Sequence, residues 1–211
     1  MSTTHDHRIL HAVEASLAEE FAGVFNLATI TRFVESSYEE LAENATMVMY
    51  LPVLVERFAR QRLRALAYAE GLVTTGMPVV LFLCVHNAGR SQMALGFFHR
   101  YAGEQAIGWS GGSAPSSELG ENSVVVMSEK GIDISDEFPK PWTDEVIRAA
   151  DVVITMGCGE ACPIFPGKRY EEWTLADPDE CDDLDDARYV RDVIEDRVIA
   201  LLDELGITPV P

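Results

Sequence analysis

One short segment of the chain carries the residue types that nucleophilic attack on an oxyanion needs. It reads Cys84-Val85-His86-Asn87-Ala88-Gly89-Arg90-Ser91. A cysteine thiolate is a strong nucleophile, and it is favoured where backbone N–H groups and a helix N-terminus supply partial positive charge. Arg90 follows Cys84 with five residues between them, a spacing that allows its guanidinium two parallel hydrogen bonds to a tetrahedral oxyanion. The segment therefore predicts an anion-binding loop in which Cys84 attacks the bound anion.

The other residues of this loop suit the same purpose. Gly89 permits backbone conformations closed to most residues, and Asn87 can adopt a left-handed conformation or brace the loop with its amide. The Ser91 hydroxyl can donate to the thiolate. The alternative is a buried thiol at the end of a strand and an arginine on the surface, which the strand before the loop and the helix after it disfavour. We expect the oxyanion to be bound by Arg90 and by the backbone of Val85, His86, Asn87, Ala88 and Gly89.

The loop must be positioned by the elements on either side of it. Residues 79–84 form a continuous apolar run, which is typical of a strand buried on both faces, and residues 91–101 show helical spacing of apolar side chains. Further strands are predicted at 106–109, 151–156 and 170–175, and further helices at 122–130, from Thr143, and at 184–205. This alternation predicts an α/β fold, a parallel sheet with helices on both faces.

A connector with two glycines and a proline divides the chain at residues 71–78. Before it, apolar residues recur at helical spacing in three segments, with Thr29 or Thr31 as the expected cap of the second helix. Three helices in so short a stretch predict a small bundle. We therefore expect two domains, a three-helix bundle at residues 1–75 and a catalytic domain at residues 76–211.

The overall charge excludes several classes of partner. The chain has 16 basic and 35 acidic residues and a formal net charge of -19, which disfavours nucleic acid and anionic membranes. A run of arginines in the bundle is better interpreted as the solvated face of a helix than as a DNA contact, because the bundle as a whole is acidic. These are Arg57, Arg60, Arg62 and Arg64. With no apolar segment long enough to span a bilayer and no secretory signal, we expect a cytoplasmic protein.

From about residue 77 to residue 205, about two-thirds of the chain, the sequence resembles the low-molecular-weight protein tyrosine phosphatases. Within that fold it is similar to the arsenate reductases that regenerate through thioredoxin, especially actinobacterial-type members with an N-terminal helical bundle. The motifs are the Cys84–Ser91 loop, Gln92-Met93-Ala94, Ser110-Gly111-Gly112-Ser113, Pro139-Lys140-Pro141, the strand Asp151–Met156, and Asp177-Pro178. The resemblance implies a four-stranded parallel sheet flanked by helices, with the nucleophile loop after the first strand.

The resemblance also implies a general acid. Asp177 would protonate the oxygen that leaves the attacked anion. Taken alone, Asp177 begins an acidic run that is more typical of a solvated loop leading into a helix. In the phosphatases the Asp-Pro pair is typically followed by tyrosine, whereas Asp179 stands here, which counts against a phosphotyrosine enzyme.

Two further thiols, Cys158 and Cys162, lie three residues apart after the strand that ends at Met156. The resemblance implies that Cys158 attacks the Cys84–arsenic adduct and releases arsenite, and that Cys162 then takes over the disulfide. The spacing is narrower than in the firmicute-type reductases, so the order stays open. Inert thiols, or a zinc site shared with Cys181, are alternatives. Zinc is disfavoured because a structural site needs four ligands and the last histidine of the chain is His99.

The resemblance therefore favours an arsenate reductase that requires no cofactor or metal. Its reductant would be a thioredoxin-type protein or a mycothiol/mycoredoxin-type thiol system. One alternative is a phosphatase for phosphotyrosine or small phosphomonoesters, which needs the loop and the acid but no additional thiols. A second alternative is a non-enzymatic protein whose thiols sense arsenic.

Overall fold

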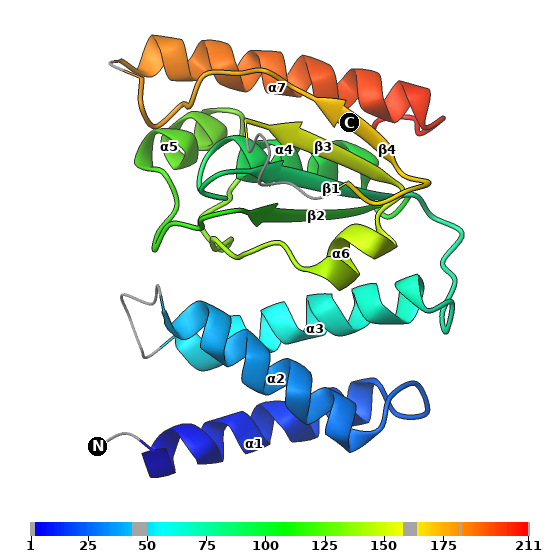
Figure 1. Cartoon of the computed structure of the whole chain (residues 1–211). Helices are drawn as coiled ribbons and strands as arrows, with labels where there is room; N and C mark the ends of the chain where they lie inside the picture. The colour runs from blue at the N-terminus through cyan, green and yellow to red at the C-terminus, as the bar shows by residue number, and fades with distance from the viewer. Residues whose placement is uncertain (1–2, 44–49, 158–163, 182, 211) are drawn as a thin grey trace. The chain divides into compact units, whose positions relative to one another are not determined.

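The computed structural model describes residues 3–43, 50–157, 164–181 and 183–210, with side chains from Leu10 onward. Figure 1 shows the whole chain as a ribbon. The chain divides into two compact units, Met1–Thr74 and Thr75–Pro211. In the part that the structure describes, no helix is long and apolar enough to cross a membrane.

The first unit consists of three helices, as predicted. They are α1 (Thr3–Glu20), α2 (Leu27–Ala42) and α3 (Leu51–Ala69). Their apolar faces meet in a core that includes Leu17, Val34 and Phe58, all with no measurable exposure. The predicted cap of α2 was wrong. Asn26 caps this helix by accepting a hydrogen bond from the Thr29 backbone N–H at 2.9 Å, because an asparagine amide serves as well as a threonine hydroxyl and lies before the first apolar residue.

Three arginines of α3 make contacts within the bundle, and of these Arg64 lies on the solvated face as predicted. Arg60 donates to Glu20 and to Glu56, each at 2.6 Å, and so joins α3 to α1. The guanidinium of Arg62 lies 4.9 Å from the centre of the Phe33 ring and thereby covers α2. The side chains of Arg60 and Arg62 therefore help to pack the three helices together. The charge count alone did not predict this role.

The second unit is built on a four-stranded parallel sheet, which confirms the predicted fold class. The strands are β1 (Val79–Cys84), β2 (Ile107–Gly112), β3 (Val152–Met156) and β4 (Arg169–Glu172), in the order β2-β1-β3-β4. All six residues of β1 are buried, because this strand is central in the sheet and has helices on both faces. The register places Cys84 between Gly112 and Met156. The chain leaves β1 on one face of the sheet and reaches β3 from the other face. In parallel sheets such a change of face leaves a crevice at the carboxyl end of the strand, here β1.

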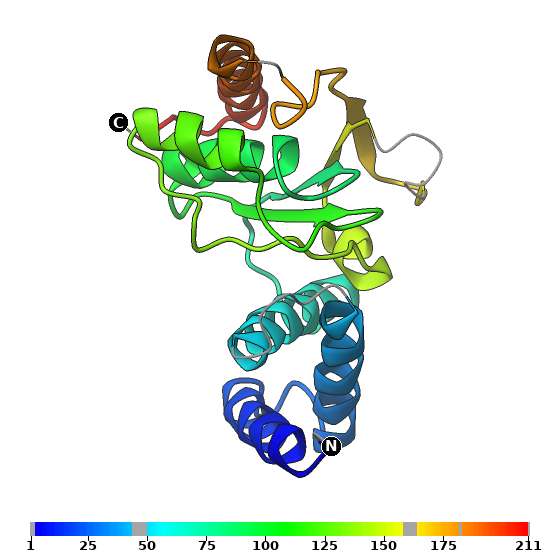
Figure 2. The ribbon, with the colours of Figure 1, turned by 90° about the vertical axis from the view of Figure 1, so that its left-hand side faces the viewer.

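Helices flank the sheet on both faces (Figures 1 and 2). They are α4 (Arg90–Ala102), α5 (Glu121–Glu129), α6 (Asp144–Ala149) and α7 (Leu184–Glu204). Helices α4, α5 and α7 cover one face and α6 covers the other. The main core lies under the first three, where the Phe82 ring of β1 contacts those of Phe98 and Trp173 at 5.5 and 6.0 Å between centroids. This packing fixes the end of β1 relative to the start of α4.

Strand β2 is longer than predicted, because the pair Gly111-Gly112 belongs to the strand and not to a turn. A Cβ on Gly112 would lie 2.6 Å from the Val85 carbonyl oxygen, and one on Gly111 would lie 3.0 Å from Trp142. Only glycine allows the loop after β1 to approach the neighbouring strand this closely. Strand β4 is shorter than predicted and ends at Glu172.

Candidate active site

The backbone of the loop between β1 and α4 turns its N–H groups inward. Four of its carbonyl groups accept hydrogen bonds from the amides of the segment 113–120. They are those of Cys84, Val85, His86 and Ala88, bonded to Ser113 (3.3 Å), Ala114 (2.9 Å), Ser116 (3.0 Å) and Gly120 (3.2 Å). Since C=O and N–H point in opposite directions across a planar peptide, the N–H groups that follow these carbonyls face the interior of the loop.

Several amides of the loop and of the start of α4 are unpaired. The backbone N–H groups of His86, Gly89 and Ser91 have no hydrogen-bond partner within the described part of the chain. Ser91 also belongs to the first turn of α4, whose dipole adds partial positive charge at the same place. A ring of unpaired amides at a helix N-terminus is a binding site for a small anion.

The Cys84 sulfur accepts hydrogen bonds from two sides. The Asn87 backbone N–H donates to Sγ at 3.2 Å, and the Ser91 Oγ lies 3.0 Å from the same atom. The Asn87 side-chain nitrogen Nδ2, which can only donate, bonds the Ser91 Oγ at 2.9 Å. The serine oxygen therefore accepts from asparagine, and its own hydrogen can be donated to Sγ when Cys84 is a thiolate. Two donors aimed at one sulfur stabilise its thiolate form.

Asn87 holds the loop in its conformation through hydrogen bonds. Its backbone is left-handed, with φ of 48°. Its Oδ1 accepts from the backbone N–H of Lys140 at 3.0 Å and from Gln92 Nε2 at 3.2 Å. The Asn87 carbonyl also accepts from Gln92 Nε2, at 3.0 Å. All of these bonds are buried, so they fix the loop where no water competes for them.

Replacing Asn87 with alanine is expected to destabilise the protein by about 2–4 kcal/mol, because buried donors lose their acceptor and alanine is disfavoured in the left-handed region. We also expect phosphate, a small tetrahedral anion, to bind about tenfold more weakly, since the loop loses the side chain that holds it in place. Urea denaturation followed by circular dichroism measures the first effect, and calorimetric titration measures the second.

Asn26→Ala is the matched control, because it removes an amide cap from the helical unit. We expect it to cost about 1 kcal/mol and to leave phosphate affinity unchanged. Equal stability losses in the two variants, or unaltered phosphate binding by Asn87→Ala, would contradict the bracing role.

A buried cation lies behind the loop. The Lys140 side chain is 3% exposed, and its Nζ donates to Ser110 Oγ and to the Phe138 carbonyl, each at 3.3 Å. The same Nζ lies 4.7 Å from the centre of the Phe138 ring and 3.7 Å from a Glu137 carboxylate oxygen. Its positive charge therefore stands close to the backbone that holds Asn87.

Arg90 is directed toward the acid loop, residues 175–180. Its Nη2 donates to Asp177 Oδ2 at 2.7 Å, and its Nη1 lies 3.4 Å from the Leu175 carbonyl. Gly157, beside the guanidinium, has φ of 81°, a conformation that favours glycine, and a Cβ there would lie 2.9 Å from Nη1. The Arg90 Nε is buried and has no partner among the described residues. Two of the five guanidinium N–H groups thus hold the acid loop, and the Nε–H is not used by the described residues.

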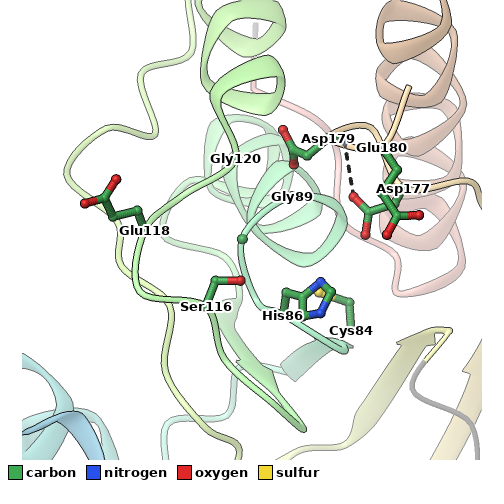
Figure 3. Close-up of a pocket in the computed structure, with 10 residues that line it drawn as sticks. Cys84, His86, Gly89, Ser116, Glu118, Gly120, Asp177, Asp179 and Glu180 are labelled. Atoms are coloured by element: carbon green, nitrogen blue, oxygen red, sulfur yellow. Dashed lines mark hydrogen bonds between the residues drawn. The ribbon is translucent and has the colours of Figure 1, made fainter. Parts of the chain in front are cut away.

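The loop and the acid loop enclose a pocket of about 270 Å³, drawn in Figure 3. Its lining comprises Cys84, His86, Ala88, Gly89, Ser116, Glu118, Gly120, Asp177, Asp179 and Glu180. Cys84 is only 2% exposed, so its sulfur lies at the bottom of this pocket and not on the surface. Among the described lining residues the only ring is the imidazole of His86. The site therefore offers space and donors for a small tetrahedral anion and no aromatic wall for a larger one.

The structure brings together the loop, Arg90 and Asp177 from segments far apart in the sequence. Cys158 and Cys162 lie outside the described residues. Cys181 is partly buried, and its thiol donates to the Asp177 carbonyl oxygen at 3.3 Å. Burial, and to a smaller extent the nearby carboxylates, raise the pKa of this thiol. Within the described ranges, no cluster of three or more His, Cys, Asp or Glu side chains is arranged to hold a metal.

Sequence reasoning missed the residues that seat the acid loop on α5. Asn122 Nδ2 donates to the Pro178 carbonyl at 3.1 Å, and Ser123 bonds the Asp179 carboxylate through its hydroxyl at 2.8 Å. The sequence signal was the pair of short polar residues Asn122 and Ser123 in the first turn of a helix. Such residues are common at helix starts, so the signal did not point to a partner 56 positions away.

Comparisons with known proteins agree with this geometry. Residues 10–67 match the protein-tyrosine-phosphatase-like N-terminal domain, and residues 79–208 match the low molecular weight phosphotyrosine protein phosphatase family. A putative arsenate reductase of Halobacterium salinarum is 36% identical over 130 residues, 59% of this chain and 91% of that protein. The arsenate reductase of Bacillus subtilis is 33% identical over 129 residues, 57% of this chain and 91% of that protein.

Solved structures extend the similarity to both units. The thioredoxin-dependent arsenate reductase of Corynebacterium glutamicum is 44% identical with a TM-score of 0.86, and the match covers 98% of each chain. An arsenate reductase in the phosphate-binding state is 33% identical with a TM-score of 0.53, over 61% of this chain and 99% of that one. The chain thus belongs to the low molecular weight phosphotyrosine protein phosphatase family, in the group of arsenate reductases that carry a helical N-terminal domain.

Proposed function

We propose that this protein reduces arsenate to arsenite. The observation that carries the proposal is the Cys84 sulfur at the base of a small pocket, surrounded by unpaired amides and hydrogen-bonded by two donors. Arsenate is a tetrahedral oxyanion of the size that such a ring accepts. The arsenate reductases among the relatives and solved structures support the same substrate.

In the first step the Cys84 thiolate attacks arsenic and an S–As bond forms. Asp177 protonates one arsenate oxygen, and that oxygen leaves as water. The entering anion takes the place of Asp177 as a partner of the Arg90 guanidinium, which frees the carboxyl for the leaving oxygen. The inward amides stabilise the negative charge on the remaining oxygens in the transition state.

In the second step the Cys158 thiolate attacks Cys84 Sγ. A Cys84–Cys158 disulfide forms, the electron pair of the S–As bond passes to arsenic, and As(V) leaves as arsenite, As(III). Cys162 then attacks Cys158 and releases Cys84 as a thiolate. The two thiols oxidised per turnover are restored by an external dithiol. We infer a thioredoxin-type reductant, because the solved structure that matches 98% of the chain is named thioredoxin-dependent.

The pocket argues against a phosphotyrosine phosphatase. The lining residues that the structure describes include four carboxylates, on Glu118, Asp177, Asp179 and Glu180, and no Phe, Tyr or Trp ring on which an aryl phosphate would stack. Carboxylates at the pocket wall repel any further negative charge that a phosphopeptide carries. An inorganic ion needs neither an aromatic wall nor additional contacts.

The relay has a direct test in steady-state arsenate turnover with thioredoxin, thioredoxin reductase and NADPH. We expect the Cys158→Ser/Cys162→Ser variant to lose at least about 100-fold in turnover, because both thiols of the relay that attacks the Cys84 adduct are removed. Phosphate affinity should not change, since the anion loop is intact. Mass spectrometry after one turnover should find Cys84 linked to Cys158, or Cys158 linked to Cys162.

Cys181→Ser is the control, since serine retains a donor for the Asp177 carbonyl. It should keep turnover within about twofold, a change that corresponds to under ~0.5 kcal/mol. Wild-type turnover in the double variant would refute the relay. Turnover with mycothiol and mycoredoxin, and none with thioredoxin, would assign the other reductant. Arsenite binding by the wild type without any turnover would favour a sensor.

A further inference from the structure

Asp179 makes a set of contacts that no step of the reaction uses. Its Oδ2 accepts from Ser123 Oγ at 2.8 Å and its Oδ1 accepts from the Ser123 backbone N–H at 3.2 Å. Both donors belong to the first turn of α5, where the helix dipole favours a carboxylate. This one side chain therefore joins the acid loop to the N-terminus of a helix that is separate in sequence.

The same residue orients the general acid. The backbone N–H of Asp179 donates to Asp177 Oδ1 at 3.2 Å, as the dashed line in Figure 3 marks. The other oxygen of Asp177, Oδ2, accepts from Arg90. Both oxygens of the Asp177 carboxyl thus accept a hydrogen bond, and one of these two bonds depends on the position of the Asp179 backbone.

Two glycines leave the space that the Asp179 carboxylate occupies. A Cβ on Gly120 would lie 1.8 Å from Asp179 Oδ2, and a Cβ on Gly89 would lie 2.5 Å from the same atom. The backbone of Gly120 has φ of -67°, which any residue can adopt, so the glycine is needed here for space and not for conformation. The structure thus keeps a cavity for this carboxylate at two independent positions.

The arrangement is retained at an energetic cost. Burial raises the pKa of the Asp179 carboxyl more than its Ser123 hydrogen bonds lower it, and the nearby Asp177 raises it further. A carboxyl whose pKa is raised on folding makes the folded state less stable at neutral pH, where the group is ionised.

We propose that Asp179 is a positioning residue, a latch that pins the acid loop to the start of α5 and thereby aims the Asp177 carboxyl at the anion bound over Cys84. The latch rests on the proposed arsenate reduction, in which Asp177 is the acid. It acts through Asp177 and makes no contact with the reacting atoms. It also explains why aspartate, and not an aromatic residue, follows the Asp-Pro pair in this chain.

The test is the rate of arsenite formation in a single turnover of pre-reduced enzyme, without thioredoxin. Asp179→Asn cannot accept from both Ser123 donors, since its NH2 group meets one of them. We expect its rate to fall roughly 10- to 100-fold through misplacement of the acid. The arsenate concentration at half-maximal rate should stay unchanged or fall, because a negative charge leaves the pocket wall. The unfolding midpoint should be unchanged or higher.

Gly120→Ala is the second variant, because it displaces the same carboxylate while leaving Asp179 in place. It should show a similar loss of rate. Glu121→Gln is the matched control: it removes an exposed carboxylate from the same helix turn and should leave the rate unchanged. In an Asp177→Asn background, Asp179→Asn should cost less than about twofold further, since a residue that acts through Asp177 has nothing left to position.

Hydrogen exchange at residues 175–181 gives a readout that needs no turnover. Exchange should be faster in Asp179→Asn and Gly120→Ala and unchanged in Glu121→Gln. Wild-type rates in the first two variants, or a full additional loss in the Asp177→Asn background, would overturn the latch. Wild-type protein that forms no arsenite would overturn the proposed function instead, and the exchange pattern would still decide whether Asp179 pins the loop.

Discussion

Cys84→Ser is expected to lower arsenate reduction at least about 1,000-fold, because removing the nucleophile of an enzyme leaves only binding and charge stabilisation. A serine hydroxyl at this position meets the same two donors, the Asn87 amide and the Ser91 hydroxyl. Neither donor is a base that could take its proton, so the hydroxyl remains a weak nucleophile. Arsenite formation in a single turnover is the measurement.

The fold and the anion site should survive this substitution. We expect the unfolding midpoint to change little and phosphate to bind within a few-fold of its wild-type affinity, because oxygen replaces sulfur in an otherwise unchanged ring of amides. A variant that binds phosphate and forms no arsenite would assign the loss to chemistry. Residual reduction within tenfold of wild type would show that another thiol makes the first attack.

Arg90→Lys is expected to lower kcat/KM for arsenate about 100- to 1,000-fold, although the charge is conserved. The guanidinium bonds Asp177 and the Leu175 carbonyl through two nitrogens and keeps a third N–H unpaired beside the loop. A lysine ammonium is a single point charge, so it offers neither the fork of bonds that holds the acid loop before the anion enters nor the two parallel bonds that an oxyanion accepts from a guanidinium. Initial rates over a range of arsenate concentrations measure the effect.

Arg191→Lys is the matched control for this variant. Arg191 is as buried as Arg90 and lies on α7, where it donates to the Val126 carbonyl and to Glu129 on α5. Its replacement should reduce stability and leave kcat/KM per folded molecule within about twofold, an effect under ~0.5 kcal/mol on the barrier. Wild-type kcat/KM in Arg90→Lys would mean that the guanidinium fork is not needed for the anion.

The net negative charge of the whole molecule opposes anion binding at the site. With a net charge of -19 and four carboxylates in the pocket wall, the protein repels anions at long range. Attraction must therefore come from groups of the loop itself: the unpaired amides, the N-terminus of α4 and Arg90. Such short-range donors are strong because the site is buried, and solvent and salt screen them little.

The sequence determined those parts of the protein that depend on contiguous residues. The apolar run before Cys84 made β1 a central strand, and the alternation of strands and helices made the sheet parallel, since these patterns reflect burial along single elements. The spacing of Cys84, Arg90 and Ser91 indicated an anion loop for the same reason, because all three stand within one turn and the start of one helix. The roles of Cys158 and Cys162 stay predictions.

Only the tertiary structure decided which distant groups complete the site. Arg90 forms an ion pair with Asp177, 87 positions away in the sequence. Asn87 accepts a hydrogen bond from the Lys140 backbone N–H, 53 positions away. Asp179 accepts one from Ser123, 56 positions away. Local patterning carries no information about such pairs, since each residue alone is typical of a loop or a helix start. Gly112 lies beyond the predicted end of its strand at residue 109 and is a strand residue for the same physical reason. Its role is set by the backbone that packs against it and not by its neighbours in sequence.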